Sequence, residues 1–249
     1  MQDILIALAS EPFIDRATEA NLATLLAAME EAAAEGADLV CFGEAFLQGF
    51  DCMDWDFAAD KRMAVTRDSS EINRIREASR RLGVDVMFGY LERDGEIIYS
   101  SCMLVEKGEI TRNYRRISRG WKEFRKTDEH YREGTETFTF GYRGWKCCMA
   151  LCGDMWDFPE RFRLGADILF WPLYCSYTRE GWLQTEHPAY AGQCRDHAPL
   201  TLMINSLCGQ DSLGGCAVYQ AGKVARLLEP GKEGLLCVKP LQMIKGPPS

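Results

Sequence analysis

The sequence predicts an α/β fold in which helices cover a mixed β-sheet, and three observations support this prediction. The chain opens with a strand, a helix and a second strand, hairpin signals follow, and strands and helices alternate again in the C-terminal half. Its 249 residues, 47% of them apolar, suffice for one sizeable core. No linker, low-complexity tract or internal repeat interrupts the chain, so we expect residues 1–249 to form a single domain.

The first half of the chain sets out the elements in a clear order. Apolar runs over 4–9 and 37–42 predict two buried strands, and leucines at helical spacing between them predict a helix over 15–35 that stops near Gly36. A second helix is predicted over 69–82. Further strands are expected over 84–90, 97–105, 110–117, 135–140 and 145–151, with hairpin turns after the second and the fourth of them.

The C-terminal half repeats the alternation of strands and helices. We expect a short helix from Pro159, a helix over 181–196, and a loose tail over 246–249. The strands predicted for this half are 167–171, 200–206 and a final hairpin of 215–219 with 224–228.

Composition narrows the possible partners and the compartment. A net charge of −8 argues against nucleic-acid binding, which requires a basic face. No apolar run approaches the length of about 20 residues that spans a bilayer, and no secretory signal is evident, so no membrane association and a cytoplasmic location are expected. The eleven cysteines form no C-x-x-C pair and only three histidines are present, which predicts reduced thiols and no metal site.

Three positions combine a reactive residue type with a suitable location. Glu44 directly follows an apolar strand, although a solvent-facing turn residue is the alternative. Cys152 lies in a Cys-Gly-Asp turn after another strand and is a candidate nucleophile, whereas most of the other cysteines are expected in the core. The basic run 112–116 either supplies a cation for an oxyanion or forms a solvated strand edge.

Together these segments resemble the nitrilase, or carbon–nitrogen hydrolase, superfamily over nearly the whole chain. The most specific part is the block 151–169, which contains Cys-Gly-Asp, Phe-Pro-Glu-Arg and Gly-Ala-Asp-Ile-Leu. The supporting matches follow the order of the family's motifs: Gly43-Glu44, the Asn-Tyr-Arg-Arg segment 113–116, Arg195, Asn205, the glycines 214–215 and the segment 229–231.

The resemblance implies an α-β-β-α sandwich that often dimerises and a Glu-Lys-Cys triad that works without metal or organic cofactor. In this chain it makes Glu44 the general base and Cys152 the nucleophile, which attacks an amide carbonyl and holds the acyl group as a thioester. A lysine ammonium and a backbone N–H would stabilise the oxyanion. The implied partners are a small-molecule amide substrate and a second copy of the chain in a homodimer or higher homo-oligomer.

The cation is where the sequence departs from the family. Arg116 occupies the usual lysine position, and an arginine differs from a lysine in shape and in the direction of its donors. Three interpretations remain open: Lys122 replaces the lysine, Arg116 performs its role, or the site is impaired. Glu129 resembles the family's additional glutamate, with Asp128 as a rival and an exposed loop acid as the alternative.

Substrate recognition is predicted for residues after the strand that follows the nucleophile. Tyr174, Ser176, Tyr177 and Arg179 could hold a small acyl group, or they could serve the core and a dimer interface. The leading hypothesis is a hydrolase of a non-peptide carbon–nitrogen bond, more of an amidase than a nitrilase. The alternatives are a catalytically impaired relative that binds a ligand or partner and, more weakly, a cysteine-rich metal or redox protein.

Overall fold

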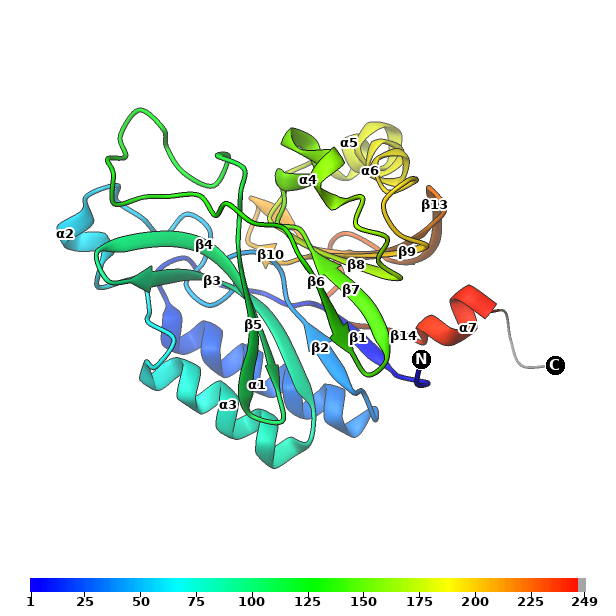
Figure 1. Ribbon diagram of the computed structural model, residues 1–249. Helices are drawn as coiled ribbons and strands as arrows, with labels where there is room; N and C mark the ends of the chain where they lie inside the picture. Colours follow the sequence, from blue (N-terminus) through cyan, green and yellow to red (C-terminus); the bar gives the residue numbers. More distant parts are fainter. Residues whose placement is uncertain (246–249) are drawn as a thin grey trace.

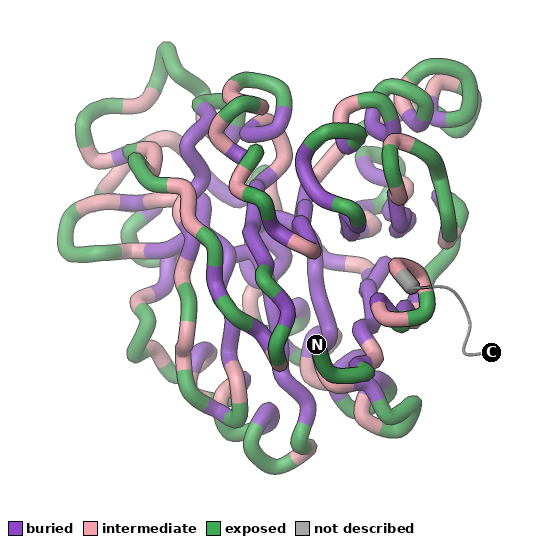
Figure 2. Tube along the Cα trace, turned by 45° about the vertical axis from the view of Figure 1, so that its right-hand side comes forward, coloured by how far each residue is buried: buried purple, intermediate pink, exposed green. Residues whose placement is uncertain are grey.

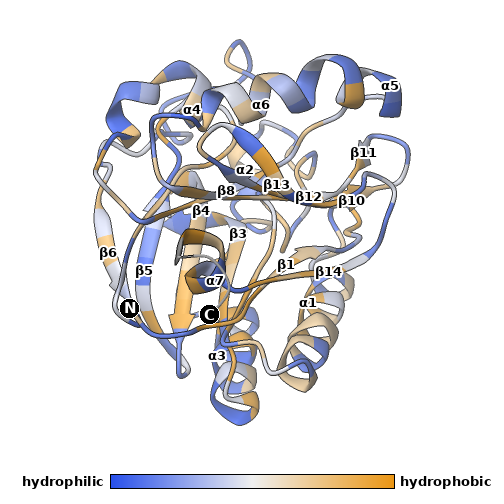
Figure 3. Cartoon of the chain, turned by 90° about the vertical axis from the view of Figure 1, so that its right-hand side faces the viewer, coloured by the Kyte–Doolittle hydropathy of each residue, from blue (hydrophilic) through white to orange (hydrophobic). Residues whose placement is uncertain are grey.

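Two six-stranded β-sheets face each other between two layers of helices (Figure 1). The computed structural model describes residues 1–245, so the tail predicted over 246–249 lies outside the described residues. The helices α1 (Thr18–Ala34) and α3 (Ser70–Leu82) cover the outer face of the first sheet. In Figure 3 they lie below the two sheets, and the helices α4 (Asp154–Asp157), α5 (Arg179–Gly181) and α6 (His187–Gln193) lie above them. The predicted α/β class and α-β-β-α sandwich are both confirmed.

The first sheet combines parallel and antiparallel strands. Strands β1, β2 and β3 are parallel to one another, and β4 and β5 follow as antiparallel neighbours. Its order is β14 (Gly234–Val238), β1 (Ile6–Ser10), β2 (Leu39–Cys41), β3 (Asp85–Asp94), β4 (Ile97–Glu106) and β5 (Glu109–Arg115).

The second sheet repeats this plan. Strands β7, β8 and β9 are parallel to one another, and each edge is completed by antiparallel strands. Its order is β13 (Lys223–Leu228), β12 (Cys216–Gln220), β9 (Leu200–Asn205), β8 (Ile168–Leu173), β7 (Trp145–Met149) and β6 (Thr139–Tyr142). A separate short ribbon pairs β10 (Leu207–Cys208) with β11 (Ser212–Leu213).

The remaining helices are short. Six of them lie outside the layer of α1 and α3: α2 (Phe57–Asp60), α4 (Asp154–Asp157), the 3-10 turn η1 (Pro159–Phe162), α5 (Arg179–Gly181), α6 (His187–Gln193) and α7 (Pro240–Lys245). Five residues of π-helix, Trp182–Glu186, connect α5 to α6. No helix among residues 1–245 is both long enough and apolar enough to span a membrane.

Apolar side chains fill two interfaces of the sandwich. One cluster lies between the sheets, where Ile6 and Leu8 of β1 join Cys147 and Met149 of β7. The other lies between the first sheet and its helices and includes Leu22 and Ile75. Figure 2 shows the result, with buried strands at the centre and exposed loops and helix faces outside. Burial of these two layers holds the strand ends in fixed positions, where the candidate residues lie.

Local signals explain the helix bounds. The Ser69 side chain accepts the backbone N–H of Ile72 and caps α3, which ends at Gly83 in the left-handed region at φ +71°. The predicted stop of the first helix is also confirmed, because α1 ends just before Gly36, whose φ is +76°.

Two predictions about elements were wrong in detail. The helix predicted over 181–196 is divided into α5, the π segment and α6. Pro188 has no N–H to donate back along the helix, which accounts for the irregular turn before it. The strand expected over 135–140 begins only at Thr139. Strand β14 and helix α7 were not predicted, because a single short apolar run carries no periodic signal.

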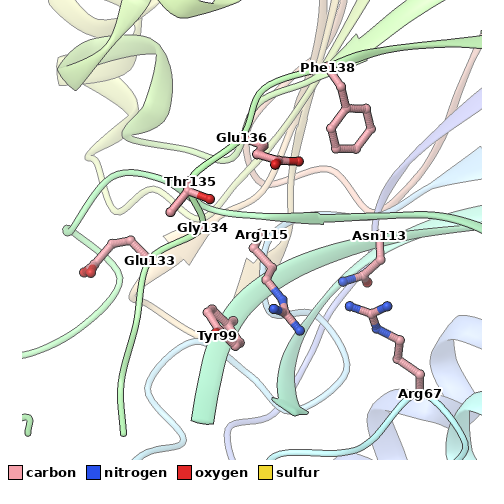
Figure 4. A pocket seen from close by; sticks show the side chains of 9 residues that line it. All are labelled: Arg67, Tyr99, Asn113, Arg115, Glu133, Gly134, Thr135, Glu136 and Phe138. Atoms are coloured by element: carbon pink, nitrogen blue, oxygen red, sulfur yellow. The ribbon is translucent and has the colours of Figure 1, made fainter. Parts of the chain in front are cut away.

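A buried carboxylate ties β3 to the neighbouring strands. Glu92 accepts hydrogen bonds from Arg67, Arg115, Ser101 and Asn113, and its side chain is only 1% exposed. Arg67, Asn113 and Arg115 also line a pocket of about 300 Å³ on the outside of the molecule (Figure 4). Burial opposes ionisation of Glu92, but the bonds from Arg115 and Ser101 and the charge of Arg67 outweigh it and lower its pKa from 4.5 to about 2.

This pKa predicts an acid-dependent loss of stability. Because the folded pKa lies below the unfolded one, the stabilisation is complete above about pH 5 and is lost as the pH falls towards 2. We expect Glu92→Gln to lower the free energy of unfolding by about 3 kcal/mol at pH 7, measured by urea denaturation. The difference from wild type should shrink below about pH 4.5. A difference that is independent of pH would contradict this assignment.

Candidate active site

The carboxyl ends of three strands bring Glu44, Arg116 and Cys152 to one end of the sandwich. Glu44 follows β2, Arg116 follows β5, and Cys152 follows β7. Strands β2 and β5 point in the same direction because two antiparallel steps separate β3 from β5. Parallel strands present their carboxyl ends at a common edge, so residues 72 and 36 positions apart in sequence meet there.

Glu44 and Arg116 form a buried ion pair. The guanidinium Nη1 of Arg116 lies 2.9 Å and 3.0 Å from the two carboxylate oxygens of Glu44, and Ser100 donates to the same carboxylate at 2.7 Å. The two residues are 0% and 3% exposed. Burial opposes the charge of Arg116, but the negative charges of Glu44 and its neighbours outweigh that effect and raise the pKa of Arg116 above its ordinary value. Arg116 therefore remains a cation.

Asp154 connects the cysteine turn to the segment that carries Arg116. One carboxylate oxygen accepts the backbone N–H groups of Ile117 and Ser118 at 3.0 Å and 2.8 Å. The other accepts the hydroxyl of Tyr114 at 2.6 Å and the backbone N–H of Leu151 at 2.9 Å. Four hydrogen bonds to one buried carboxylate fix the two segments relative to each other.

Cys152 lies at a constrained turn. Its φ is +40°, in the left-handed region that residues with a side chain seldom adopt. The N–H of Cys152 donates to the carbonyl of Pro172 at 3.0 Å, and the carbonyl of Cys152 accepts from Trp171 Nε1 at 2.9 Å. Gly153 must lack a side chain, because a Cβ there would lie 2.6 Å from Nη2 of Arg116. The guanidinium thus packs directly against the backbone that follows the thiol.

The thiol of Cys152 lies against the backbone beside a second cysteine. Its Sγ donates to the carbonyl of Tyr174 at 3.5 Å, and the next residue along the chain is Cys175. Interaction with the nearby thiol of Cys175, together with burial, raises the pKa of Cys152 well above its ordinary value, and the charge of Arg116 opposes this rise. Among residues 1–245, no group of three or more Cys, His, Asp or Glu side chains could hold a metal ion.

Of the two candidate cations, the structure brings Arg116 and not Lys122 into contact with Glu44. The ammonium of Lys122 instead pairs with Glu133 at 2.8 Å and donates to the carbonyl of Tyr131 at 2.5 Å. Lys122 is therefore held within its own loop. Glu129 lies exposed on that loop, where its backbone carbonyl accepts from Arg132, so it does not join the buried cluster.

The four predicted substrate-binding residues lie in different surroundings in the structure. Tyr174 lies beside the candidate nucleophile, and its ring stacks on Phe50 at 4.5 Å. Tyr177 stacks on Trp182 at 4.5 Å, which is a packing position. Ser176 and Arg179 are exposed, and neither is brought to the Glu44 cluster.

A small pocket of about 180 Å³ is lined by Phe50, Asp51, Met53, Trp55, Gly120, Trp121, Lys122 and Glu123, and none of Glu44, Arg116 and Cys152 is among these residues. A Cβ on Gly120 would lie 2.9 Å from Nη2 of Arg116, and Phe50 stacks on Tyr174. The pocket is therefore bordered by residues that contact both the cation and the neighbourhood of the thiol. The larger pocket in Figure 4 is lined in part by Arg115. The guanidinium of Arg115 donates to Glu92 and not to Glu44, so this pocket is separate from the candidate active site.

Sequence reasoning assigned no role to several residues of the cluster. Ser100 and Ser118, which bond to Glu44 and Arg116, carry no local signal in the sequence. Asp154 belongs to the Cys-Gly-Asp motif, and the motif alone could have suggested its structural role. Cys175 was grouped with the core cysteines, because only the fold brings it to Cys152.

The buried ion pair yields a prediction about stability. Arg116→Met should lower the free energy of unfolding by about 3–5 kcal/mol, because Glu44 is left buried without its cation. Adding Glu44→Gln should recover part of that loss, whereas Glu44→Gln alone should destabilise the protein. Urea denaturation of the four proteins in this cycle measures the coupling. Equal effects of Glu44→Gln in both backgrounds would contradict the pairing.

Comparison with solved structures supports the architecture. A CN-hydrolase superfamily protein from Xanthomonas campestris, with an arsenic adduct in its active site, matches with a TM-score of 0.78 and 20% identity over 96% of this chain and 90% of that one. A mutant of the amidase from Nesterenkonia sp. AN1, which shows Michael addition of acrylamide at the active site cysteine, matches with a TM-score of 0.74 and 19% identity over 95% and 92%. Both likenesses concern the fold.

The sequence is similar to known enzymes over only part of their length. An arylacetone-specific nitrilase from Alcaligenes faecalis is 32% identical over 119 residues, which are 44% of this chain and 33% of the nitrilase. A glutamine-dependent NAD(+) synthetase from Thermotoga maritima is 29% identical over 142 residues, 56% of this chain and 23% of the synthetase. These matches thus span a third or less of either relative. The family model described as carbon-nitrogen hydrolase matches residues 6–238, so the chain belongs to the carbon–nitrogen hydrolase family.

Proposed function

We propose that this protein hydrolyses the carbon–nitrogen bond of a small amide through a thioester on Cys152. The observation that carries the proposal is the juxtaposition of a buried carboxylate, a permanent cation and a thiol at one end of the sandwich. A thiolate is a strong nucleophile for an acyl carbon, and a fixed cation stabilises the negative charge that develops on the carbonyl oxygen.

The reaction requires two proton acceptors at different stages. Cys152 must lose its thiol proton before it attacks the carbonyl carbon, and the leaving amine must gain a proton. Water must then be deprotonated to cleave the thioester, and Glu44 is the candidate base for that step. Arg116 cannot exchange a proton at ordinary pH, so its contribution is electrostatic.

The size of the neighbouring pocket favours a small substrate. About 180 Å³ has room for few non-hydrogen atoms. Phe50, Trp55 and Trp121 provide apolar walls for an acyl group, and the charged residues Asp51, Lys122 and Glu123 complete the lining. The matched relatives include both nitrilases and an amidase, so the amide preference is part of the proposal.

A second candidate function rests on Arg116 itself. Its guanidinium is held at two of its three nitrogens, with Nη1 donating to Glu44 at 2.9 Å and Nε donating to Ser118 at 2.7 Å. An arginine committed in this way would leave the site able to bind an amide or acyl ligand without turnover. Replacing Arg116 by lysine distinguishes a hydrolase from a protein that binds the ligand without turnover.

The nucleophile is tested by ammonia release from a panel of small amides, ureas and nitriles. We expect Cys152→Ala to lower turnover of an accepted substrate by about 10³-fold or more, because the thioester cannot form. The matched control is Cys237→Ala, since Cys237 is a half-buried thiol in β14. Equal ammonia release by wild type and Cys152→Ala would refute the proposal.

The role of the cation is tested with Arg116→Lys. We expect kcat to fall about tenfold or more, because an ammonium cannot reproduce the bonds to both Glu44 and Ser118 while it faces the oxyanion. Arg112→Lys, at an exposed position on β5, is the matched control and should leave kcat unchanged. A rise in kcat on Arg116→Lys would instead support the impaired site.

A further inference from the structure

One nitrogen of the Arg116 guanidinium has no hydrogen-bond partner within the part of the chain that the structure describes. Nε donates to Ser118 Oγ at 2.7 Å, and Nη1 donates to both carboxylate oxygens of Glu44. Among residues 1–245, no group accepts from Nη2, although Arg116 is only 3% exposed. A charged donor that is buried without an acceptor is costly, so Nη2 is available to an oxygen that the protein itself does not supply.

Two glycines leave room for this nitrogen. A Cβ on Gly153 would lie 2.6 Å from Nη2, and a Cβ on Gly120 would lie 2.9 Å from it. The guanidinium cannot move aside without losing its bonds, because its other two nitrogens are held by Glu44 and Ser118. Gly153 directly follows the candidate nucleophile, and Gly120 lines the pocket of about 180 Å³. Nη2 is therefore close both to the thiol turn and to a wall of the pocket.

These contacts suit an arginine and not a lysine. A lysine has no Nε to donate to Ser118, and it has no second terminal nitrogen to lie beside the two glycines. Ser118 is itself buried and fixed, since its backbone N–H donates to Asp154 at 2.8 Å. The residues around position 116 thus fit the larger cation, which argues for a site built around arginine rather than one damaged by it.

We propose that Ser118 and Gly120 are positioning residues for Arg116, and that they keep Nη2 free to bind the carbonyl oxygen of the substrate beside Cys152. When the Cys152 sulfur bonds to the acyl carbon, the π electron pair of the carbonyl moves onto this oxygen, where Nη2 stabilises the charge. The pair returns when the C–N bond breaks, and the amine leaves with the C–N electron pair and the proton given up by the thiol. This inference rests on the proposed function and names the residues through which the arginine serves it.

The inference is tested by alkylating Cys152 with two reagents that differ in the carbonyl group. Iodoacetamide carries an amide oxygen for Nη2 to bind, whereas iodomethane has no oxygen, and peptide mass spectrometry measures both rates at one pH. The ratio of the two rates cancels changes in the thiolate fraction of Cys152. We expect Gly120→Ala to lower this ratio by about tenfold or more, because the added methyl group displaces Nη2 from the amide oxygen. Ser118→Ala, which removes the acceptor for Nε, should lower the ratio in the same direction.

A double substitution separates a positioning role from a structural one. In the Arg116→Lys background, Gly120→Ala should not lower the ratio further, because no Nη2 remains to be displaced. The matched control is Gly141→Ala on β6, which should leave the ratio unchanged, since a Cβ there would have no neighbour within 4 Å among the described residues.

Two outcomes would overturn the inference: equal slowing of both reagents by Gly120→Ala and Ser118→Ala, or an equal effect of Gly120→Ala with arginine and with lysine at position 116. The two substitutions act on different nitrogens of the guanidinium, so either one decides the matter should the other prevent folding. Because alkylation needs no turnover, absence of ammonia release would refute the proposed function, while the ratio still decides whether Nη2 binds an amide oxygen.

Discussion

The buried ion pair between Glu44 and Arg116 is the interaction on which the site depends. It forms across the first sheet, from the end of β2 to the end of β5, and neither charge has access to solvent. Removing either partner leaves an uncompensated charge in a medium of low polarity, which is costly. The pair therefore requires the strands of the first sheet to align correctly, and it keeps a cation beside the backbone of Gly153.

Asp154 extends this constraint to the second sheet. Its carboxylate binds the backbone on both sides of the site, at Leu151 and at Ile117 and Ser118, so the thiol turn and the arginine segment cannot move independently. Fixed donors and charges stabilise a transition state without the cost of reorienting during the reaction. The strained φ of Cys152 is maintained by the same network.

Sequence reasoning predicted most of the strands and both long helices, and it selected Glu44 and Cys152 as candidates, because periodicity and short motifs are local properties. It left the choice between Arg116 and Lys122 open, since contact depends on the course of the loop after β5 rather than on spacing. The ion pair with Glu133 fixes the position of the Lys122 side chain, and no local sequence pattern predicts this pair. Cys175 was overlooked for the same reason: its partner Tyr190 lies on a different element.

If the ion pair serves covalent chemistry at Cys152, an acyl intermediate on this residue can be trapped. Wild-type protein is mixed with an amide that it hydrolyses, quenched in acid and digested for mass spectrometry. We expect the peptide containing Cys152 to gain the mass of the acyl group, and we expect Glu44→Gln, which lacks the base for water, to accumulate more of this adduct. Ammonia release with no acyl mass on Cys152 in either protein would contradict this role of the ion pair.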